Sequence, residues 1–129
     1  MEPPKIIIVE DESIIALDIQ CTLENSGYSV PAVVSSGEES VEKASEIRPD
    51  LVLMDIKLSG KMDGINAAKE IYSRFRIPVV YLTAYSDEKI MEAIQEINFF
   101  GYVSKPFDER LLQCAIKKAL SEKGFKFIN

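Results

Sequence analysis

Four apolar residues, 51–54, run without interruption into the carboxylate of Asp55. A short apolar run of this kind is typical of a strand covered on both faces, as in a parallel sheet packed between helices. Asp55 then stands at the carboxyl end of that strand, the edge at which open α/β sheets bind their ligands. A carboxylate that ends a buried strand is costly unless a cation meets it. We therefore take Asp55 as the first candidate for a functional residue.

Further strands and helices alternate around this stretch. We expect the other strands at residues 5–9, 30–34, 79–82 and 101–104, and helices at about 13–26, 36–47, 64–75, 86–97 and 108–122. Ser36 and Glu39 have the spacing of a capping box, Asp63 can cap the third helix, and Pro31 places its strand at a sheet edge. Strands joined by helical crossovers are parallel. The sequence therefore predicts an α/β fold, a three-layer doubly wound domain with a five-stranded parallel sheet.

The length of 129 residues predicts one domain, at residues 1–123, with 124–129 as a C-terminal tail or the start of a linker. The apolar stripes of the helices are expected to be buried, including Ile14, Leu17 and Cys21 on the first helix and Leu111 on the last. Cys21 and Cys114 lack CxxC spacing, which favours small core thiols in a reducing compartment over a disulfide or a redox role.

Composition excludes several classes of function. The net charge of −6 argues against binding of nucleic acid or of an anionic membrane by this domain. The sequence contains no histidine, which excludes a histidine-based triad and a histidine-ligated zinc site. There is no signal-peptide pattern and no apolar run near the length of a membrane span, so the cytoplasm is the expected location.

Polar side chains follow four of the five predicted strands. They are Glu10 and Asp11 after the first, Asp55 after the third, Thr83 after the fourth and Lys105 after the fifth. Because the carboxyl ends of parallel strands meet at one edge of a sheet, we expect these residues to converge on one site.

Charge indicates what such a site holds. Two carboxylates about 4 Å apart repel by roughly 4 kcal/mol at an effective dielectric constant near 20, so a cation is needed. Mg²⁺ suits the residues, because it prefers one or two carboxylates and leaves its other positions to water and phosphate oxygens. Asp55 can then attack phosphorus, while Thr83 and Lys105 are suited to contact phosphoryl oxygens.

Each feature also has a structural interpretation. Residues 10–12 alone read more readily as a solvated turn that caps the first helix. Thr83 can simply begin a turn, Lys105 can be an exposed lysine, and Tyr102 alone reads more readily as a core residue. Asp55 is the hardest to explain in this way, and the set taken together favours a phosphoacceptor.

Five sequence pieces, in order, resemble the receiver domain (CheY-like) of two-component response regulators. The pieces span residues 8–12, 53–55, 62–64, 82–84 and 101–107, and the resemblance covers roughly residues 4–121. It implies a flavodoxin-like fold with strand order 2-1-3-4-5 and a switch that transmits signals rather than an enzyme. It also implies that Asp55 is the phosphoacceptor, that Asp11 ligates Mg²⁺, that Glu10 holds Mg²⁺ mainly through water, and that the Lys57 backbone carbonyl is another ligand.

The resemblance further implies that Thr83, the Ala84 backbone and Lys105 bind the phosphoryl group, and that Tyr102 moves inward with Thr83 on activation. The implied partners are a histidine kinase or phosphotransfer protein, a downstream output domain or protein, and, on phosphorylation, a second copy of the chain. The implied signalling surface is formed by the fourth helix, fifth strand and fifth helix.

The chain departs from the family pattern in two places. Glu10 stands where many relatives have Asp, and the loop at residues 58–61 lacks the common proline and is one residue longer. Two alternative functions stay open. A Mg²⁺-dependent phosphatase would need a second carboxylate where Lys57 stands, and an interaction module independent of phosphorylation would be expected to lack Asp55, Thr83 or Lys105.

Overall fold

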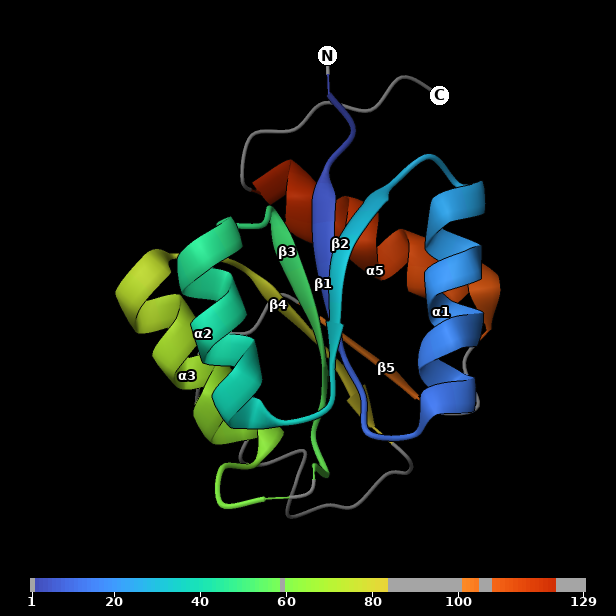
Figure 1. Cartoon of the computed structure of the whole chain (residues 1–129). Helices are drawn as coiled ribbons and strands as arrows, with labels where there is room; N and C mark the ends of the chain where they lie inside the picture. The colour runs from blue at the N-terminus through green and yellow to red at the C-terminus, as the bar shows by residue number, and fades with distance from the viewer. Residues whose placement is uncertain (1, 59, 84–100, 105–107, 123–129) are drawn as a thin grey trace.

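The computed structural model describes residues 2–58, 60–83, 101–104 and 108–122 (Figure 1). Its elements, in chain order, are β1 (Lys5–Val9), α1 (Ser13–Asn25), β2 (Ser29–Val34), α2 (Gly37–Ile47), β3 (Leu51–Asp55), α3 (Gly64–Phe75), β4 (Val79–Thr83), β5 (Tyr102–Ser104) and α5 (Glu109–Glu122). All strand pairs are parallel, in the order β2-β1-β3-β4-β5. The predicted α/β fold and strand order are confirmed. The helix expected at residues 86–97 lies outside the described residues.

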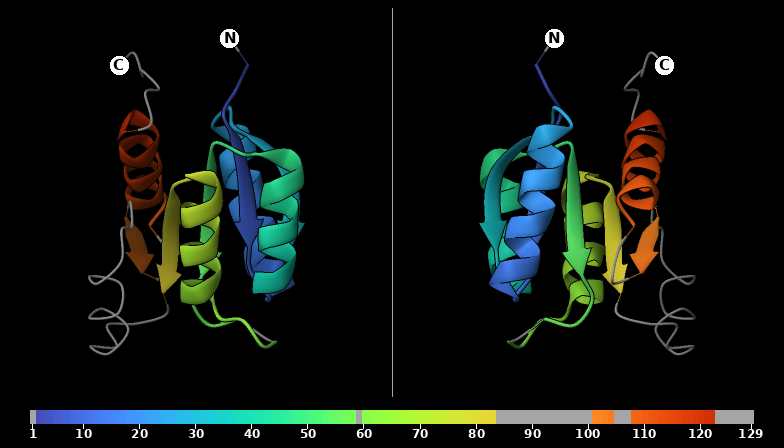
Figure 2. Two further views of the ribbon diagram at one scale, coloured as in Figure 1. Left: turned by 90° about the vertical axis from the view of Figure 1, so that its left-hand side faces the viewer. Right: turned by 90° about the vertical axis from the view of Figure 1, so that its right-hand side faces the viewer.

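Helices cover both faces of the sheet, which explains the apolar strands. Figures 1 and 2 show α2 and α3 on one face and α1 and α5 on the other. Successive residues of one strand point to opposite faces, so Val52 and Met54 pack with α2 and α3 while Leu51 and Leu53 pack with α1 and α5. All five residues of β3 are buried. The sheet therefore holds the carboxyl end of β3 rigidly.

Local signals set the ends of several elements as predicted. The Ser36 hydroxyl accepts a hydrogen bond from the Glu39 N–H at 3.2 Å, and the Asp63 carboxylate accepts one from the Asn66 N–H at 2.8 Å. Both are N-caps of the helices that follow. Pro31 lies in the edge strand β2, where the pairing with β1 shifts register between Lys5 and Ile7.

Several predictions of burial are wrong. Cys21 and Cys114 are exposed free thiols, and Ile14, Leu17 and Leu111 are 85%, 60% and 63% exposed. In α1 the buried residues are Ala16, Ile19 and Leu23. Residues 14, 17 and 21 each precede or follow one of these by two positions, which is about 200° around a helix, so they lie on the outer side. A helix on one face of a sheet buries a single stripe, and the apolar residues on its other side stay in solvent.

Within the described ranges, no helix has the length and the apolar character needed to cross a membrane.

Candidate functional site

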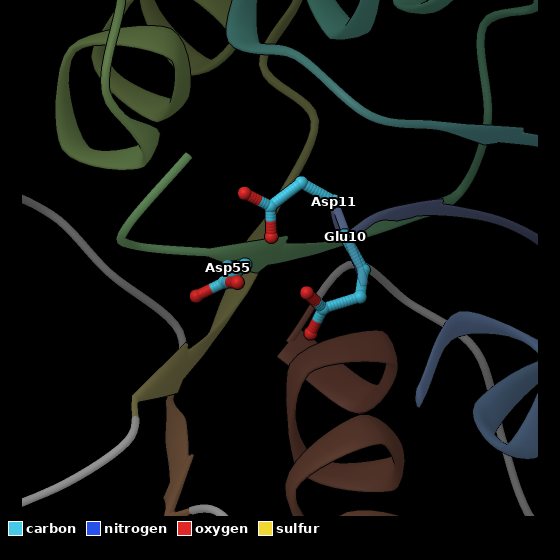
Figure 3. A group of neighbouring side chains, drawn as sticks. All are labelled: Glu10, Asp11 and Asp55. Atoms are coloured by element: carbon cyan, nitrogen blue, oxygen red, sulfur yellow. The ribbon is translucent and has the colours of Figure 1, made fainter. Parts of the chain in front are cut away.

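Three carboxylates meet at the carboxyl ends of β1 and β3 (Figure 3). Val9, the last residue of β1, pairs with Met54, so the next residue on each strand, Glu10 and Asp55, reaches the same edge of the sheet. Asp11 follows directly. Carboxylate oxygens of Glu10, Asp11 and Asp55 lie within 4.8 Å of one another. The predicted convergence of these three side chains is confirmed.

The two inner carboxylates are held by the backbone. Glu10 is 2% exposed and Asp55 is 5% exposed, whereas Asp11 is exposed to solvent. The Glu12 N–H donates to Glu10 Oε2 at 3.1 Å, and the Lys57 N–H donates to Asp55 Oδ1 at 3.2 Å. The site is thus a set of oriented carboxylate oxygens that is open to solvent on the side of Asp11.

The backbone around Asp55 is closely packed. The Ile56 N–H donates to the Leu82 carbonyl of β4 at 3.1 Å, and the Gly64 N–H donates to the Ile56 carbonyl at 2.9 Å. A Cβ on Gly64 would collide with the Asp55 carbonyl oxygen and lie 2.8 Å from Ile56 Cα. Glycine is therefore the residue that lets α3 begin directly against the end of β3.

A cleft of about 430 Å³ adjoins Glu10 and Asp11. Glu10 and Asp11 line it at one side, and Leu17 of α1, Val33 of β2 and Glu39 of α2 are among its other lining residues. Glu10 and Asp11 therefore border a cleft with a partly apolar lining.

The structure describes some of the other predicted site residues fully, some only by their backbone and some not at all. Lys57 follows Asp55 closely and holds it through its backbone N–H. Thr83 ends β4 next to Leu82, the residue paired with Asp55, so its backbone reaches the same edge. The Thr83 side chain, Ala84 and Lys105 lie outside the described part of the chain. Tyr102 is 44% exposed on β5, so its interpretation as a core residue is wrong.

Sequence reasoning did not identify one contact of the site's surroundings, between Glu38 of α2 and the loop that follows Asp55. Glu38 Oε1 accepts a hydrogen bond from the Met62 N–H at 2.7 Å. An acidic residue in the first turn of a helix looks the same in a sequence whether it serves the helix dipole or a distant loop. The contact could be found only from the packing of α2 against that loop.

Comparison with known proteins identifies the family. The sequence model of the response regulator receiver domain matches residues 6–117. The chain belongs to this family. It is a receiver domain of the two-component signalling type, and the predicted resemblance is confirmed.

Relatives of this receiver domain extend beyond it. The transcriptional regulatory protein PdtaR of Mycobacterium tuberculosis is 39% identical over 119 residues, which are 92% of this chain and 58% of PdtaR. The phyllosphere-induced regulator PhyR of Methylorubrum extorquens is 34% identical over 90% of this chain and 43% of PhyR. The chain therefore spans about half the length of the curated relatives it matches.

Solved receiver domains have the same architecture. The receiver domain of a modulated diguanylate cyclase from Desulfovibrio desulfuricans superimposes with a TM-score of 0.88 at 34% identity, covering 94% of this chain and 96% of that one. The receiver domain of a Pseudomonas aeruginosa sensor histidine kinase was solved with a magnesium ion coordinated in its active-site cleft. It has a TM-score of 0.83 at 30% identity, covering 92% of this chain and 98% of that one.

Proposed function

We propose that Asp55 accepts a phosphoryl group from the phosphohistidine of a histidine kinase or a phosphotransfer protein. The convergence of Asp55 with Glu10 and Asp11 at the carboxyl edge of the sheet carries this proposal. An Asp55 carboxylate oxygen attacks phosphorus, the bond from phosphorus to the imidazole nitrogen breaks, and that nitrogen keeps the electron pair. The product is an aspartyl phosphate. The Lys57 N–H orients the carboxylate for this attack through Oδ1.

The donor set fits Mg²⁺. All three side chains offer carboxylate oxygens, the ligands that this hard ion prefers, and the exposed side of the site admits water and phosphate oxygens. Asp11 and Asp55 would hold the ion directly and Glu10 mainly through water, with the Lys57 carbonyl as a further ligand. Bound there, the ion would offset the negative charge that the carboxylates and the incoming phosphoryl group bring together.

The proposed switch follows from the added charge. An aspartyl phosphate adds about −1.5 to −2 charges if it titrates like other protein phosphates. Thr83, the Ala84 backbone and Lys105 would bind its oxygens, and Tyr102, now exposed on β5, would move inward as Thr83 shifts. Moving a two-state element from 1:99 to 99:1 needs about 5.5 kcal/mol. Two or three charge-assisted hydrogen bonds at about 1.5–3 kcal/mol each supply that amount.

The same proposal makes the protein a phosphoacceptor switch rather than an enzyme with an external substrate. Lys57 stands two residues after Asp55, where an aspartate-dependent phosphatase would need its second carboxylate. The partners would be a kinase, an output domain or protein reached through the surface around β5 and α5, and a second copy on phosphorylation. Because the kinase draws on ATP, we place the protein in the cytoplasm. We assign residues 1–123 to the receiver domain, whose described part includes α5 (Glu109–Glu122), and 124–129 to a tail or linker.

Phosphorylation by acetyl phosphate, followed by intact-protein mass spectrometry, tests the assignment of Asp55. We expect one phosphoryl group on the wild type in the presence of Mg²⁺ and none on Asp55→Asn. Asp18→Asn, an exposed aspartate of α1, is the matched control and should be labelled like the wild type. Equal labelling of Asp55→Asn and the wild type would refute the proposal.

A further inference from the structure

The loop between β3 and α3, residues 56–63 (the β3–α3 loop), connects Asp55 to the start of α3. It begins at Ile56, whose backbone bonds to β4 and to Gly64 hold the base of the loop closed. Lys57 follows, and its backbone N–H donates a hydrogen bond to Asp55 Oδ1. The backbone N–H that orients Asp55 therefore belongs to the first residues of this loop.

One side chain outside the loop holds its far end. Glu38 Oε1 accepts the Met62 N–H at 2.7 Å, joining residues that are 24 positions apart in the sequence. A hydrogen bond from a backbone N–H to a carboxylate is charge-assisted, and this length is at the short end of the usual range. Glu38 Oε2 lies beside Gly60, whose φ of +106° suits glycine, and a Cβ there would be 3.1 Å from that oxygen.

Two neighbouring glutamates at the start of α2, Glu38 and Glu39, make different contacts. Glu39 belongs to the helix cap, because its Oε1 accepts hydrogen bonds from the hydroxyls of Ser35 and Ser36 at 3.4 and 3.3 Å. Glu38 points instead to the loop. The two segments also meet at the backbone, since a Cβ on Gly37 would be 2.8 Å from the Met62 carbonyl oxygen. Glu38 is thus more than an acidic residue that complements the helix dipole.

We propose that Glu38 is a positioning residue of the phosphorylation site. It holds the β3–α3 loop against α2 and thereby sets the backbone of Lys57 for Asp55 and for Mg²⁺; this inference rests on the proposed function above. Mg²⁺ demands near-ideal octahedral geometry. A loop released at Met62 should therefore weaken Mg²⁺ binding before it changes the reaction at saturating Mg²⁺.

Three variants separate the hydrogen bond from charge and from helix stability. Glu38→Ala removes the acceptor, whereas Glu38→Gln removes the charge but keeps an oxygen that can accept the Met62 N–H. Glu42→Ala removes the same charge from an exposed position one turn further along α2. Two quantities are measured: the Mg²⁺ concentration giving half-maximal phosphorylation by acetyl phosphate, and the amide exchange rate of Met62 by NMR without Mg²⁺.

We expect Glu38→Ala to raise the half-maximal Mg²⁺ concentration by about five- to tenfold, with the maximal rate at saturating Mg²⁺ within about twofold of the wild type. Met62 should exchange faster in that variant. Glu38→Gln, whose neutral amide oxygen accepts a weaker hydrogen bond, should give an intermediate rise of about two- to threefold. Glu42→Ala should stay within about twofold of the wild type in both measurements. If Glu38→Ala and Glu42→Ala need the same Mg²⁺ concentration, the proposal is overturned, whatever the exchange of Met62. A wild type that takes no phosphoryl group would instead refute the proposed function.

Discussion

The two strand-to-helix junctions that carry the carboxylates are built in opposite ways. Glu10 and Asp11 lie in a junction of three residues between Val9 and Ser13, whereas Asp55 is followed by the eight residues of the β3–α3 loop. The short junction follows the sheet: the Glu10 N–H donates to the Val34 carbonyl at 3.0 Å, and the Ala16 N–H donates to the Glu12 carbonyl at 3.0 Å. In the described residues no side chain caps α1.

The long junction depends on contacts from elsewhere. Gly64 admits the start of α3 against Asp55, Glu38 holds Met62, and Asp63 caps α3. A three-residue connection has few conformations available once both ends are fixed, whereas an eight-residue loop must be ordered by specific contacts. We infer that residues of the short junction act mainly through their chemistry, and those around the long junction mainly through packing.

The largest expected effect is at the long junction. Gly64→Ala should lower the free energy of unfolding by about 1–3 kcal/mol, because the new Cβ collides with the backbone of Asp55 and Ile56. Helix propensity alone would predict the opposite sign, since alanine is favoured over glycine by about 1 kcal/mol inside a helix. Urea denaturation measures the change.

Gly27→Ala is the control for Gly64→Ala. Gly27 has a φ of +93° but open space around its Cβ position, so only the backbone conformation should cost free energy, about 1 kcal/mol. A stabilised Gly64→Ala variant would show that the long junction is not tightly packed, and the contrast between the junctions would fail.

At the short junction, Asp11→Asn should alter ligand binding. We expect Mg²⁺ to bind about tenfold more weakly, so that the stabilisation produced by a saturating Mg²⁺ concentration falls by about 1.4 kcal/mol. Thermal unfolding with and without Mg²⁺ gives this difference. Glu12→Gln, an exposed neighbour outside the carboxylate cluster, should keep the wild-type response. An equal loss in both variants would mean that overall charge, and not the Asp11 ligand, sets the affinity.

Substitutions at the N-caps of α1 and α3 should change the free energy of unfolding by smaller amounts and in opposite directions. Asp63→Ala should lower the free energy of unfolding by about 1 kcal/mol, because the Asn66 N–H loses its acceptor. Glu12→Ser should raise it by about 0.5–1 kcal/mol, since Glu12 has extended cap geometry without a capping bond. Asp63→Asn keeps an acceptor and should be nearly neutral. Urea denaturation midpoints of the three variants measure these changes. Destabilisation by Glu12→Ser would contradict the prediction that α1 lacks a side-chain cap.

The smallest effect is a pH dependence beside the long junction. Burial, and secondly the negative charge of Asp63, raise the pKa of Tyr81 above its ordinary value of 10.0. The folded protein therefore keeps a proton that the unfolded chain loses, and the free energy of unfolding falls as the pH rises from about 10. Tyr28, whose pKa is also raised by burial, adds a fall of the same sign.

Tyr81→Phe removes one of these two contributions, about 0.4 kcal/mol at pH 10, where half of the unfolded-state tyrosine is ionised. Denaturation of the wild type and of Tyr81→Phe between pH 8 and pH 11 measures the difference in slope. Parallel curves for the two proteins would show that Tyr81 ionises at the same pH in both states.

Sequence reasoning worked best where a signal is local or shared by a family. The caps at Ser36 and Asp63, the apolar run of β3 and the meeting of Glu10, Asp11 and Asp55 were all predicted. Burial was predicted less well. Periodicity shows that Leu17 and Ile19 lie on apolar stripes, but the side of α1 that faces the sheet depends on how the helix packs. The roles of Thr83 and Lys105 stay predictions.

By itself the sequence determined which segments become strands and helices and that carboxylates stand at strand ends, because hydrogen-bonding caps and apolar runs act over a few residues. Only the tertiary structure decided which stripe of α1 is buried, that α3 begins against the Asp55 backbone, and that Glu38 reaches Met62. These features arise from the packing of separate layers, where contacts between distant residues depend on the distance between backbones rather than on local sequence.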